Sequence, residues 1–217
     1  MFMNKTKQNQ AGFTLAEIMI TMAIAGVLLA VGMPSMREFI QNGRITAVTN
    51  ELVGTLMVAR SEAMRQVTTT CVCPTTTATA AIPACSASSN WESGWIAFSD
   101  FNSNCVIDGI APTADTLLKV WDGSQYGGQM TVRNSDGTIN AINQIRFNAR
   151  GETQSVVVGV GMAGTFSISD DRPFGVLIPE SVDSNGNVKR GAGVVLSIAG
   201  SARSTRRAAQ IIYTAPP

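Results

Sequence analysis

Residues 12–33 read GFTLAEIMITMAIAGVLLAVGM, and this apolar stretch decides how the rest of the chain is arranged. As a helix, residues 13–33 would span about 31 Å, about the thickness of the hydrocarbon core of a bilayer. Lys5 and Lys7 precede the stretch, and residues 1–12 contain no acid. Positive charge before the apolar run predicts that the N-terminus stays in the cytoplasm and that the chain then crosses outward.

Glu17 lies inside this apolar run, five residues after Gly12. A carboxylate in a bilayer costs about 3 kcal/mol or more and usually marks a function. An ordinary cleaved secretory signal or a simple anchor is the alternative interpretation. However, no small-x-small cleavage site ends the run, and no partner for the carboxylate lies within the span. The Glu17 carboxylate therefore needs a partner from outside the span.

The segment GFTLAE, residues 12–17, followed by an apolar helix with Pro34, resembles the class III signal of type IV pilins and type II secretion pseudopilins. The resemblance implies that prepilin peptidase cuts between Gly12 and Phe13 and that Phe13 is then N-methylated. It also implies that Glu17 neutralises the amino-terminal charge of a neighbouring subunit during assembly. A buried carboxylate and a buried ammonium are better tolerated as a pair than alone, which agrees with that role.

Beyond Pro34, apolar residues recur at three- and four-residue steps, which predicts one face of an amphipathic helix. These residues are Ile45, Val48, Leu52, Leu56, Ala59, Ala63 and Val67. We expect one helix over residues 13–66, with the first half in the membrane and the second half packed on a sheet. Pro34 is expected to kink the helix or open it locally.

From residue 67 on, strand-like segments alternate with turn residues, and no second long helical pattern is present. The expected strands are residues 67–73, 94–99, 116–121, 129–133, 144–148, 155–160, 164–168, 174–178 and 193–198. The pairs Asp122-Gly123, Asp136-Gly137 and Asn185-Gly186 suit tight hairpins. The sequence therefore predicts an α+β fold in which a long N-terminal helix packs on an antiparallel sheet.

All four cysteines follow the apolar run: Cys71, Cys73, Cys85 and Cys105. They favour two disulfides in an oxidising compartment, with three possible connectivities. A metal site of four thiolates is the alternative, but one residue between Cys71 and Cys73 is a shorter spacing than metal ligands usually have. Cys71 and Cys73 would point to the same face of a strand and could reach Cys85 and Cys105. Residues 74–90 read as a long surface loop tethered through Cys85.

The composition argues against an enzyme. The chain has no histidine, which removes Ser-His-Asp and Cys-His catalysis and zinc sites that need imidazole. Three oxygen-bearing side chains at alternate positions, followed by Asp108, resemble the start of a calcium-binding loop. They are Asp100, Asn102 and Asn104. Cys105 stands where that loop needs glycine, and Ala111 where it needs glutamate. A polar turn stabilised by these side chains is the preferred interpretation.

Five basic residues and no acid lie within residues 184–217, although the net charge of the chain is only +1. They are Lys189, Arg190, Arg203, Arg206 and Arg207. Clustered arginines suit contacts to phosphates. Residues 200–207, GSARSTRR, are similar in place to the C-terminal Gly-Arg-x-Arg motif through which FimT-type minor pilins bind DNA, although the spacing differs. A solvated arginine turn or a contact with a neighbouring pilin is the alternative.

Three further segments resemble the GspH/FimT-type minor pilins and pseudopilins: residues 59–63, 91–100 and 145–151. The resemblance implies a leader peptide over residues 1–12, a transmembrane and assembly helix over 13–33, its amphipathic continuation over 34–66 and a periplasmic β-rich domain over 67–217. It implies a single-pass inner-membrane protein that enters a type IV pilus and primes assembly at or near the tip. A DNA-binding minor pilin of natural transformation and a type II secretion pseudopilin are the alternatives.

We expect no cofactor. The expected partners are other pilin or pseudopilin subunits, prepilin peptidase, the inner membrane and, in the second alternative, DNA.

Overall fold

The computed structural model describes residues 12–87, 91–108, 114–126, 130–135, 143–154, 164–170, 185–186 and 191–206. The chain divides into two parts, residues 1–41 and residues 42–217. One long helix, α1 (Leu15–Gln66), runs from the first part into the second. Each part is described separately, because their relative placement is not determined.

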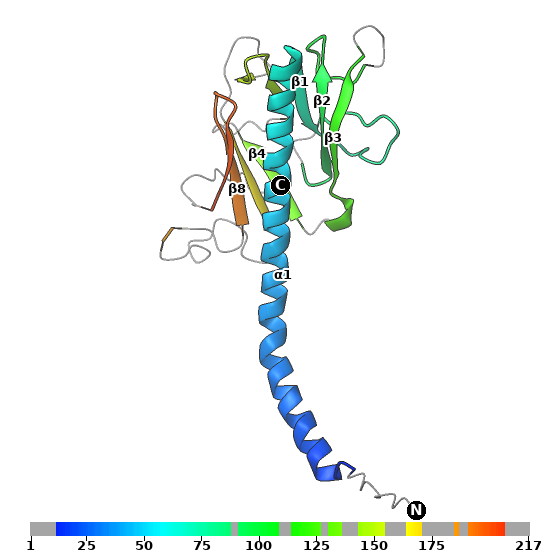
Figure 1. Cartoon of the computed structure of the whole chain (residues 1–217), viewed down its shortest axis with the longest axis vertical. Helices are drawn as coiled ribbons and strands as arrows, with labels where there is room; N and C mark the ends of the chain where they lie inside the picture. Colours follow the sequence, from blue (N-terminus) through cyan, green and yellow to red (C-terminus); the bar gives the residue numbers. More distant parts are fainter. Residues whose placement is uncertain are drawn as a thin grey trace, which may run out of the picture. The chain divides into compact units, whose positions relative to one another are not determined.

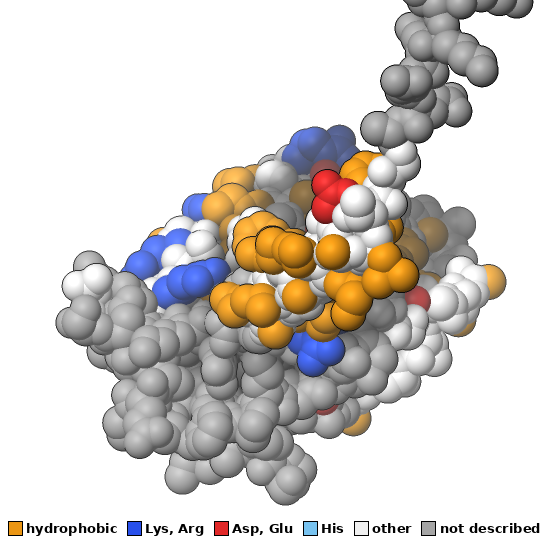
Figure 2. Space-filling view, turned by 90° about the horizontal axis from the view of Figure 1, so that it is seen from below, with side chains coloured by type: hydrophobic (Ala, Val, Ile, Leu, Met, Phe, Trp, Pro, Cys, Tyr) orange, Lys and Arg blue, Asp and Glu red, His pale blue; other side chains and the backbone are white. Residues whose placement is uncertain are grey.

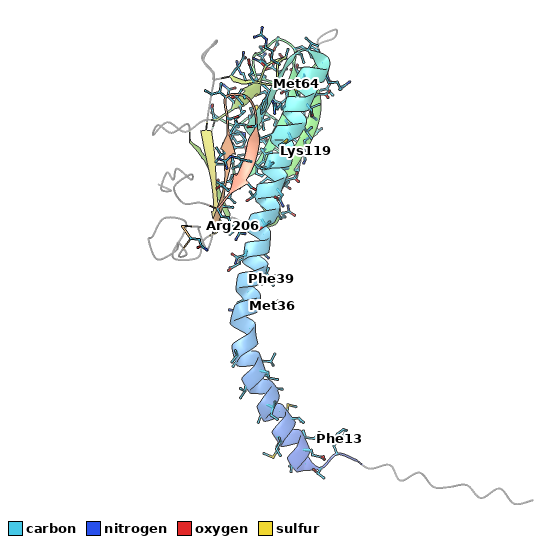
Figure 3. All side chains as sticks on the ribbon, turned by 60° about the vertical axis from the view of Figure 1, so that its left-hand side comes forward. Phe13, Met36, Phe39, Met64, Lys119 and Arg206 are labelled. Atoms are coloured by element: carbon cyan, nitrogen blue, oxygen red, sulfur yellow. A yellow bond between two sulfur atoms is a disulfide. The ribbon has the colours of Figure 1, made fainter. Side chains whose placement is uncertain are left out.

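In the first part, α1 is apolar and its large hydrophobic side chains are exposed. Leu15–Met33 is long and apolar enough to cross a membrane, as judged by length and composition, and none of it is buried. α1 remains helical through Pro34, so the local opening expected there is absent. A kink at Pro34 stays a prediction. Met36 and Phe39, which follow Pro34, are also exposed (Figure 3).

In the second part, the predicted apolar stripe of α1 is confirmed in six of its positions. The side chains of Ile45, Val48, Leu52, Leu56, Ala59 and Ala63 are fully or almost fully buried. Val67 was expected to continue the stripe, and that expectation is wrong. The helix ends at Gln66, and Val67 is exposed and has a φ of 53°, so the chain has already turned away from the helical path.

The strands form two antiparallel sheets, as Figure 1 shows on either side of α1. The first has the order β3-β2-β1-β5-β6, with β1 (Thr69–Pro74), β2 (Gly94–Asp100), β3 (Thr116–Asp122), β5 (Ile145–Phe147) and β6 (Thr153–Gln154). The second has the order β4-β7-β8-β9, with β4 (Met130–Ser135), β7 (Gly164–Asp170), β8 (Gly191–Leu196) and β9 (Ala202–Thr205). The expected α+β fold is thus confirmed.

A single apolar core joins the helix to both sheets. From the first sheet it takes Val72, Trp95, Ala97, Trp121, Ile145 and Phe147; from the second, Val132, Phe166, Ile168, Ala192, Val194, Leu196 and Ala202. Trp95 is stacked on Trp121 with ring centroids 3.9 Å apart, and its Nε1 donates a hydrogen bond to Thr55 Oγ1 of α1 at 3.1 Å. At the flank of α1, Lys119 Nζ of β3 lies 2.8 Å from Glu51 Oε1 (Figure 3).

The opposite face of the first sheet carries the cysteines. Cys71 and Cys73 alternate with core-facing Val72 along β1, as the two-residue period of a strand requires. The disulfides join Cys71 to Cys105 and Cys73 to Cys85, which selects one of the three connectivities and uses all four thiols. The loop after β1 is tethered through Cys85, as expected.

The strand and turn predictions were incomplete in three places. The short strands β6 and β9 were not predicted. The turn at Asp122-Gly123 was expected to close a tight hairpin, and this is wrong, because β3 and β4 belong to different sheets. Instead the Asp122 carboxylate accepts hydrogen bonds from the N–H and Oγ of Ser124 and starts the short 3-10 helix η1 (Ser124–Tyr126). The expected strands 155–160 and 174–178 and the Asp136-Gly137 turn lie outside the described residues.

Candidate processing and assembly site

The N-terminal end of α1 brings Phe13, Thr14 and Glu17 together. Phe13 is 86% exposed and directly precedes Thr14, whose side chain caps the helix. Thr14 Oγ1 accepts a hydrogen bond from the Glu17 N–H at 3.2 Å, and Glu17 Oε2 accepts one from the Thr14 N–H at 2.9 Å. This reciprocal arrangement is a capping box, which satisfies N–H groups that a helix start otherwise leaves without partners.

The capping box fixes the carboxylate beside the proposed cleavage bond. Thr14 Oγ1 also donates to Glu17 Oε2 at 3.0 Å, so both Thr14 contacts use the same oxygen. Within residues 12–87, Glu17 Oε1 is left for a partner from elsewhere. Figure 3 shows Phe13 at the start of α1, next to this turn. Sequence reasoning missed Thr14, although the Thr-x-x-Glu spacing is a known signal of a helix start.

Beyond the capping box, apolar side chains surround α1. Exposed residues include Ile18, Met19, Ile20 and Leu28, which the helical period places on different sides of the helix. Figure 2, seen from below, shows hydrophobic side chains gathered around this helix. A helix that is apolar all round needs an apolar environment on every side, which a bilayer or a bundle of like helices supplies.

The expected basic cluster is only partly described. Arg203 on β9 and Arg206 just after it are exposed, whereas Lys189, Arg190 and Arg207 lie outside the described residues. Arg206 Nη2 donates a hydrogen bond to Thr46 Oγ1 of α1 at 3.1 Å, and Figure 3 shows Arg206 beside the helix. The two residues border a cavity of about 280 Å³ between α1 and the β8–β9 edge. Arg206 is therefore exposed and also contacts α1 through Thr46.

Two of the family-like segments form a scaffold. Arg60 Nε of α1 donates to the Gly151 carbonyl oxygen at 3.0 Å, so residues 59–63 and 145–151 meet. Gly200 adjoins the same carbonyl: a Cβ at Gly200, which has a φ of 76°, would collide with Gly151 O. The glycine that begins the arginine-rich segment is thus required by packing against the turn at Gly151.

The third family-like segment, residues 91–100, joins the two sheets. Trp91 packs edge-on against Phe166 of β7, with ring centroids 4.9 Å apart. The backbone N–H of Trp91 donates a hydrogen bond to the Val132 carbonyl oxygen of β4. Because Trp91 lies three residues before the start of β2, its contacts hold the second sheet against the first.

The candidate calcium residues form a hydrogen-bonded polar turn. Asp108 Oδ2 accepts hydrogen bonds from the side-chain amides of Asn102 and Asn104, at 2.6 and 2.8 Å. Asp100 accepts the N–H groups of Asn104 and Cys105. Burial raises the pKa of Asp100, and the two N–H groups oppose that shift. The structure gives these side chains a role in the turn, and a calcium role stays untested.

Two family models match the chain. The model described as type II transport protein GspH matches residues 48–200, and the model of the prokaryotic N-terminal methylation motif matches residues 7–33. The second match covers the capping box and the apolar half of α1, and the first covers the second half of α1 and the strands β1 to β8.

Two curated relatives match a short part of the chain. The type IV major alpha-pilin and fimbrial protein Q, both of Moraxella bovis, are each 44% identical to this chain over 43 residues, which is 20% of this chain. The chain spans about a quarter, 27%, of the length of each relative.

Among solved structures, two crystal forms of the type IV minor pilin FimU of Pseudomonas aeruginosa are similar. One is 18% identical with a TM-score of 0.48, over 79% of this chain and 94% of that one. The other is 19% identical with a TM-score of 0.44, over 73% and 90%.

Proposed function

The chain belongs to the GspH family of type II transport proteins and carries the prokaryotic N-terminal methylation motif, and from this premise we propose that it is a minor pilin or pseudopilin subunit, cut between Gly12 and Phe13 and assembled into a filament. The observation that carries the proposal is the capped start of α1. An exposed Phe13 and a carboxylate stand together at the head of a helix whose next nineteen residues, Leu15–Met33, are able to span a membrane. In this proposal the protein is a structural subunit with prepilin peptidase, the inner membrane and other pilins as partners.

Cleavage after Gly12 would create a new ammonium at Phe13, and methylation leaves that amine basic. In the bilayer this charge and the Glu17 carboxylate are each costly alone. Glu17 Oε2 is held by Thr14, whereas Oε1 is left for an incoming donor. The capping box therefore presents a preoriented carboxylate to the Phe13 ammonium of a neighbouring subunit. Pairing across subunits would reduce the cost of both charges in the apolar helix bundle.

Two substitutions at Glu17 test this role. Glu17→Ala removes both the cap and the charge, while Glu17→Gln keeps a capping-box acceptor and removes only the charge. We expect immunoblots to show normal leader cleavage for both variants, because cleavage depends on the residues at the cut. We also expect both variants to be lost from sheared filaments. Normal incorporation of Glu17→Gln would show that the carboxylate serves only as a helix cap and would refute the charge-pairing mechanism.

Among filament subunits, we propose a priming subunit of a type IV pilus at or near the tip, and a type II secretion pseudopilin is the alternative. Deletion of the gene should abolish surface pili, and gold-labelled antibody should bind at filament ends. Label along the whole filament would contradict the tip position. Loss of protein secretion with pili intact would favour the secretion system.

DNA binding through the C-terminal arginines is the second candidate function. The observation that favours it is that Arg203, near the start of β9, and Arg206, directly after β9, are both exposed. Gel shifts of the full chain in detergent would compare wild type with an Arg203/Arg206/Arg207→Ala variant. Arg65→Ala, which removes an exposed arginine at the end of α1, is the matched control. Loss of DNA binding in the triple variant alone supports the hypothesis, and equal binding by all three proteins refutes it.

A further inference from the structure

The two disulfides lie unusually close to each other. The Sγ atoms of Cys71, Cys85 and Cys105 are all within 4.8 Å of one another, although Cys85 is bonded to Cys73 and not to either of the other two. Cys71 and Cys105 are buried, and Cys85 is half-buried. The sulfur of one disulfide therefore adjoins both sulfurs of the other.

This closeness has causes besides the disulfide bonds. The Ser86 N–H donates to the Pro74 carbonyl oxygen at 2.7 Å, which holds the end of the loop beside β1. The Cys105 N–H donates to Asp100 Oδ2 at 2.7 Å, which holds the second loop at the end of β2. Because these hydrogen bonds hold one loop beside β1 and the other at the end of β2, we expect the three sulfurs to remain neighbours when one disulfide opens.

We propose that Cys71, Cys85 and Cys105 form an internal thiol–disulfide exchange site, in which the Cys85 thiolate attacks the Cys71–Cys105 bond. The attack forms a bond from Cys85 to Cys105 or to Cys71 and releases the other sulfur of the pair as a thiolate. One S–S bond breaks and one forms, so no oxidant or reductant is consumed. The Cys85 thiolate itself arises when an external dithiol reduces the Cys73–Cys85 bond, or before that bond forms during oxidative folding.

The site is asymmetric, because Cys73 is not one of the three mutually close sulfurs. Cys73 shares the outer face of β1 with Cys71 but lies opposite Ile96, whereas Cys71 lies opposite Phe98. Exchange therefore circulates one disulfide among Cys71, Cys85 and Cys105 and leaves Cys73 as the free thiol. In two of the three resulting pairings, Cys85 is disulfide-bonded to Cys71 or Cys105. The loop after β1 therefore stays covalently attached in those two pairings after the Cys73–Cys85 bond is reduced.

The experiment compares Cys73→Ser, which leaves Cys85 as the free thiol, with Cys85→Ser, which leaves Cys73. Each full-length variant is purified in detergent, held at mildly alkaline pH and quenched with acid. Free thiols are alkylated, the remaining disulfide is reduced and labelled with a second alkylating agent, and the sites are read by peptide mass spectrometry. Tryptophan fluorescence checks the fold, because Trp95 and Trp121 are buried and stacked.

In Cys73→Ser we expect the first label to spread from Cys85 to Cys71 and Cys105, and the rate to rise with pH because the thiolate is the nucleophile. In Cys85→Ser we expect the label to remain on Cys73, with exchange slower by about tenfold or more, because Cys73 Sγ is not close to both sulfurs of the Cys71–Cys105 bond. Label that stays on Cys85 in Cys73→Ser overturns the proposal. Equal scrambling in both variants also overturns it, because general unfolding would then explain the exchange.

Wild-type protein gives a second reading if either variant fails to fold. After limited reduction with a dithiol, the molecules with one remaining disulfide are isolated and mapped in the same way. We expect pairs between Cys85 and Cys71 or Cys105, with Cys73 alkylated. If only the two original disulfides are found, in any proportion, the exchange site does not exist.

Discussion

Replacing Val67 with glycine should stabilise the protein. Val67 directly follows α1, and the Thr68 N–H donates to the Ala63 carbonyl oxygen at 3.2 Å across it, which is the helix-ending bond of a Schellman motif. The φ of 53° places Val67 in the left-handed region, which costs an L-residue about 1–2 kcal/mol. Glycine avoids this cost but loses about 0.5–1 kcal/mol through its freer unfolded chain. The side chain is 75% exposed, so little burial is lost.

The expected gain is therefore about 0.5–1 kcal/mol, or about 1–4 °C in Tm for a domain of this size. Denaturant titration of the full chain in detergent, followed by tryptophan fluorescence, would measure it. Val67→Ala keeps the Cβ, so it should gain much less. Val58→Gly removes an exposed valine from within the helix and should destabilise. If Val67→Gly is no more stable than Val67→Ala, backbone strain at this position is not the cause.

Three other predictions concern buried and strained positions. Thr55→Val leaves Trp95 Nε1 buried without an acceptor and should cost about 1–3 kcal/mol by denaturant titration, with Thr55→Ser close to wild type. At Gly186 an added Cβ meets open space at a φ of 78°, so Gly186→Ala should reduce the free energy of unfolding by about 1 kcal/mol. Gly200→Ala should cost about 1–3 kcal/mol more, because its Cβ would collide with the Gly151 carbonyl oxygen. Equal losses of stability in the two variants would contradict the close packing at Gly200. Because burial raises the pKa of Asp100 above 3.8, its contribution to stability should fall as pH rises through the window above 3.8. Asp100→Asn should therefore gain stability relative to wild type as the pH rises above 3.8, and a constant difference would contradict the raised pKa of Asp100.

The helix could be predicted because its evidence is local. The apolar run and the stripe at Ile45, Leu52 and Leu56 repeat at helical spacing, and burial confirms the stripe. The same reasoning failed at Val67, where the spacing continued but the chain turned. At the other end of the helix, the apolar run predicts a charge-pairing role for the Glu17 carboxylate and gives no sign of its capping role. The Thr-x-x-Glu spacing indicates the hydrogen bond between Thr14 and Glu17. A carboxylate in an apolar run is a stronger signal, and it points to a different role.

The division into two sheets could not be predicted from alternation alone. A strand pattern shows which face is buried but not which strand lies beside it. The turn at Asp122-Gly123 has hairpin chemistry, yet the chain crosses there to the second sheet. The contacts that fix this crossing are distant in sequence, such as Trp91 with Phe166.

The basic segment shows the same limit. Its charge is plain from sequence, but the bond from Arg206 to Thr46 joins residues 160 positions apart. No spacing rule connects them. The cysteine pairing was narrowed by strand alternation, which placed Cys71 and Cys73 on one face, and only the fold chose their partners.

The position of β1 has a mechanical consequence. Only Val67 and Thr68 separate α1 from β1, so tension on the helix reaches β1 before any other strand. β1 is interior to its sheet, with β2 along one side and β5 along the other. A pull on the helix must therefore slide β1 against both neighbours at once, and the Cys71–Cys105 disulfide ties the loop after β2 to β1. Force applied to α1 is therefore shared by three strands of the first sheet, β1, β2 and β5.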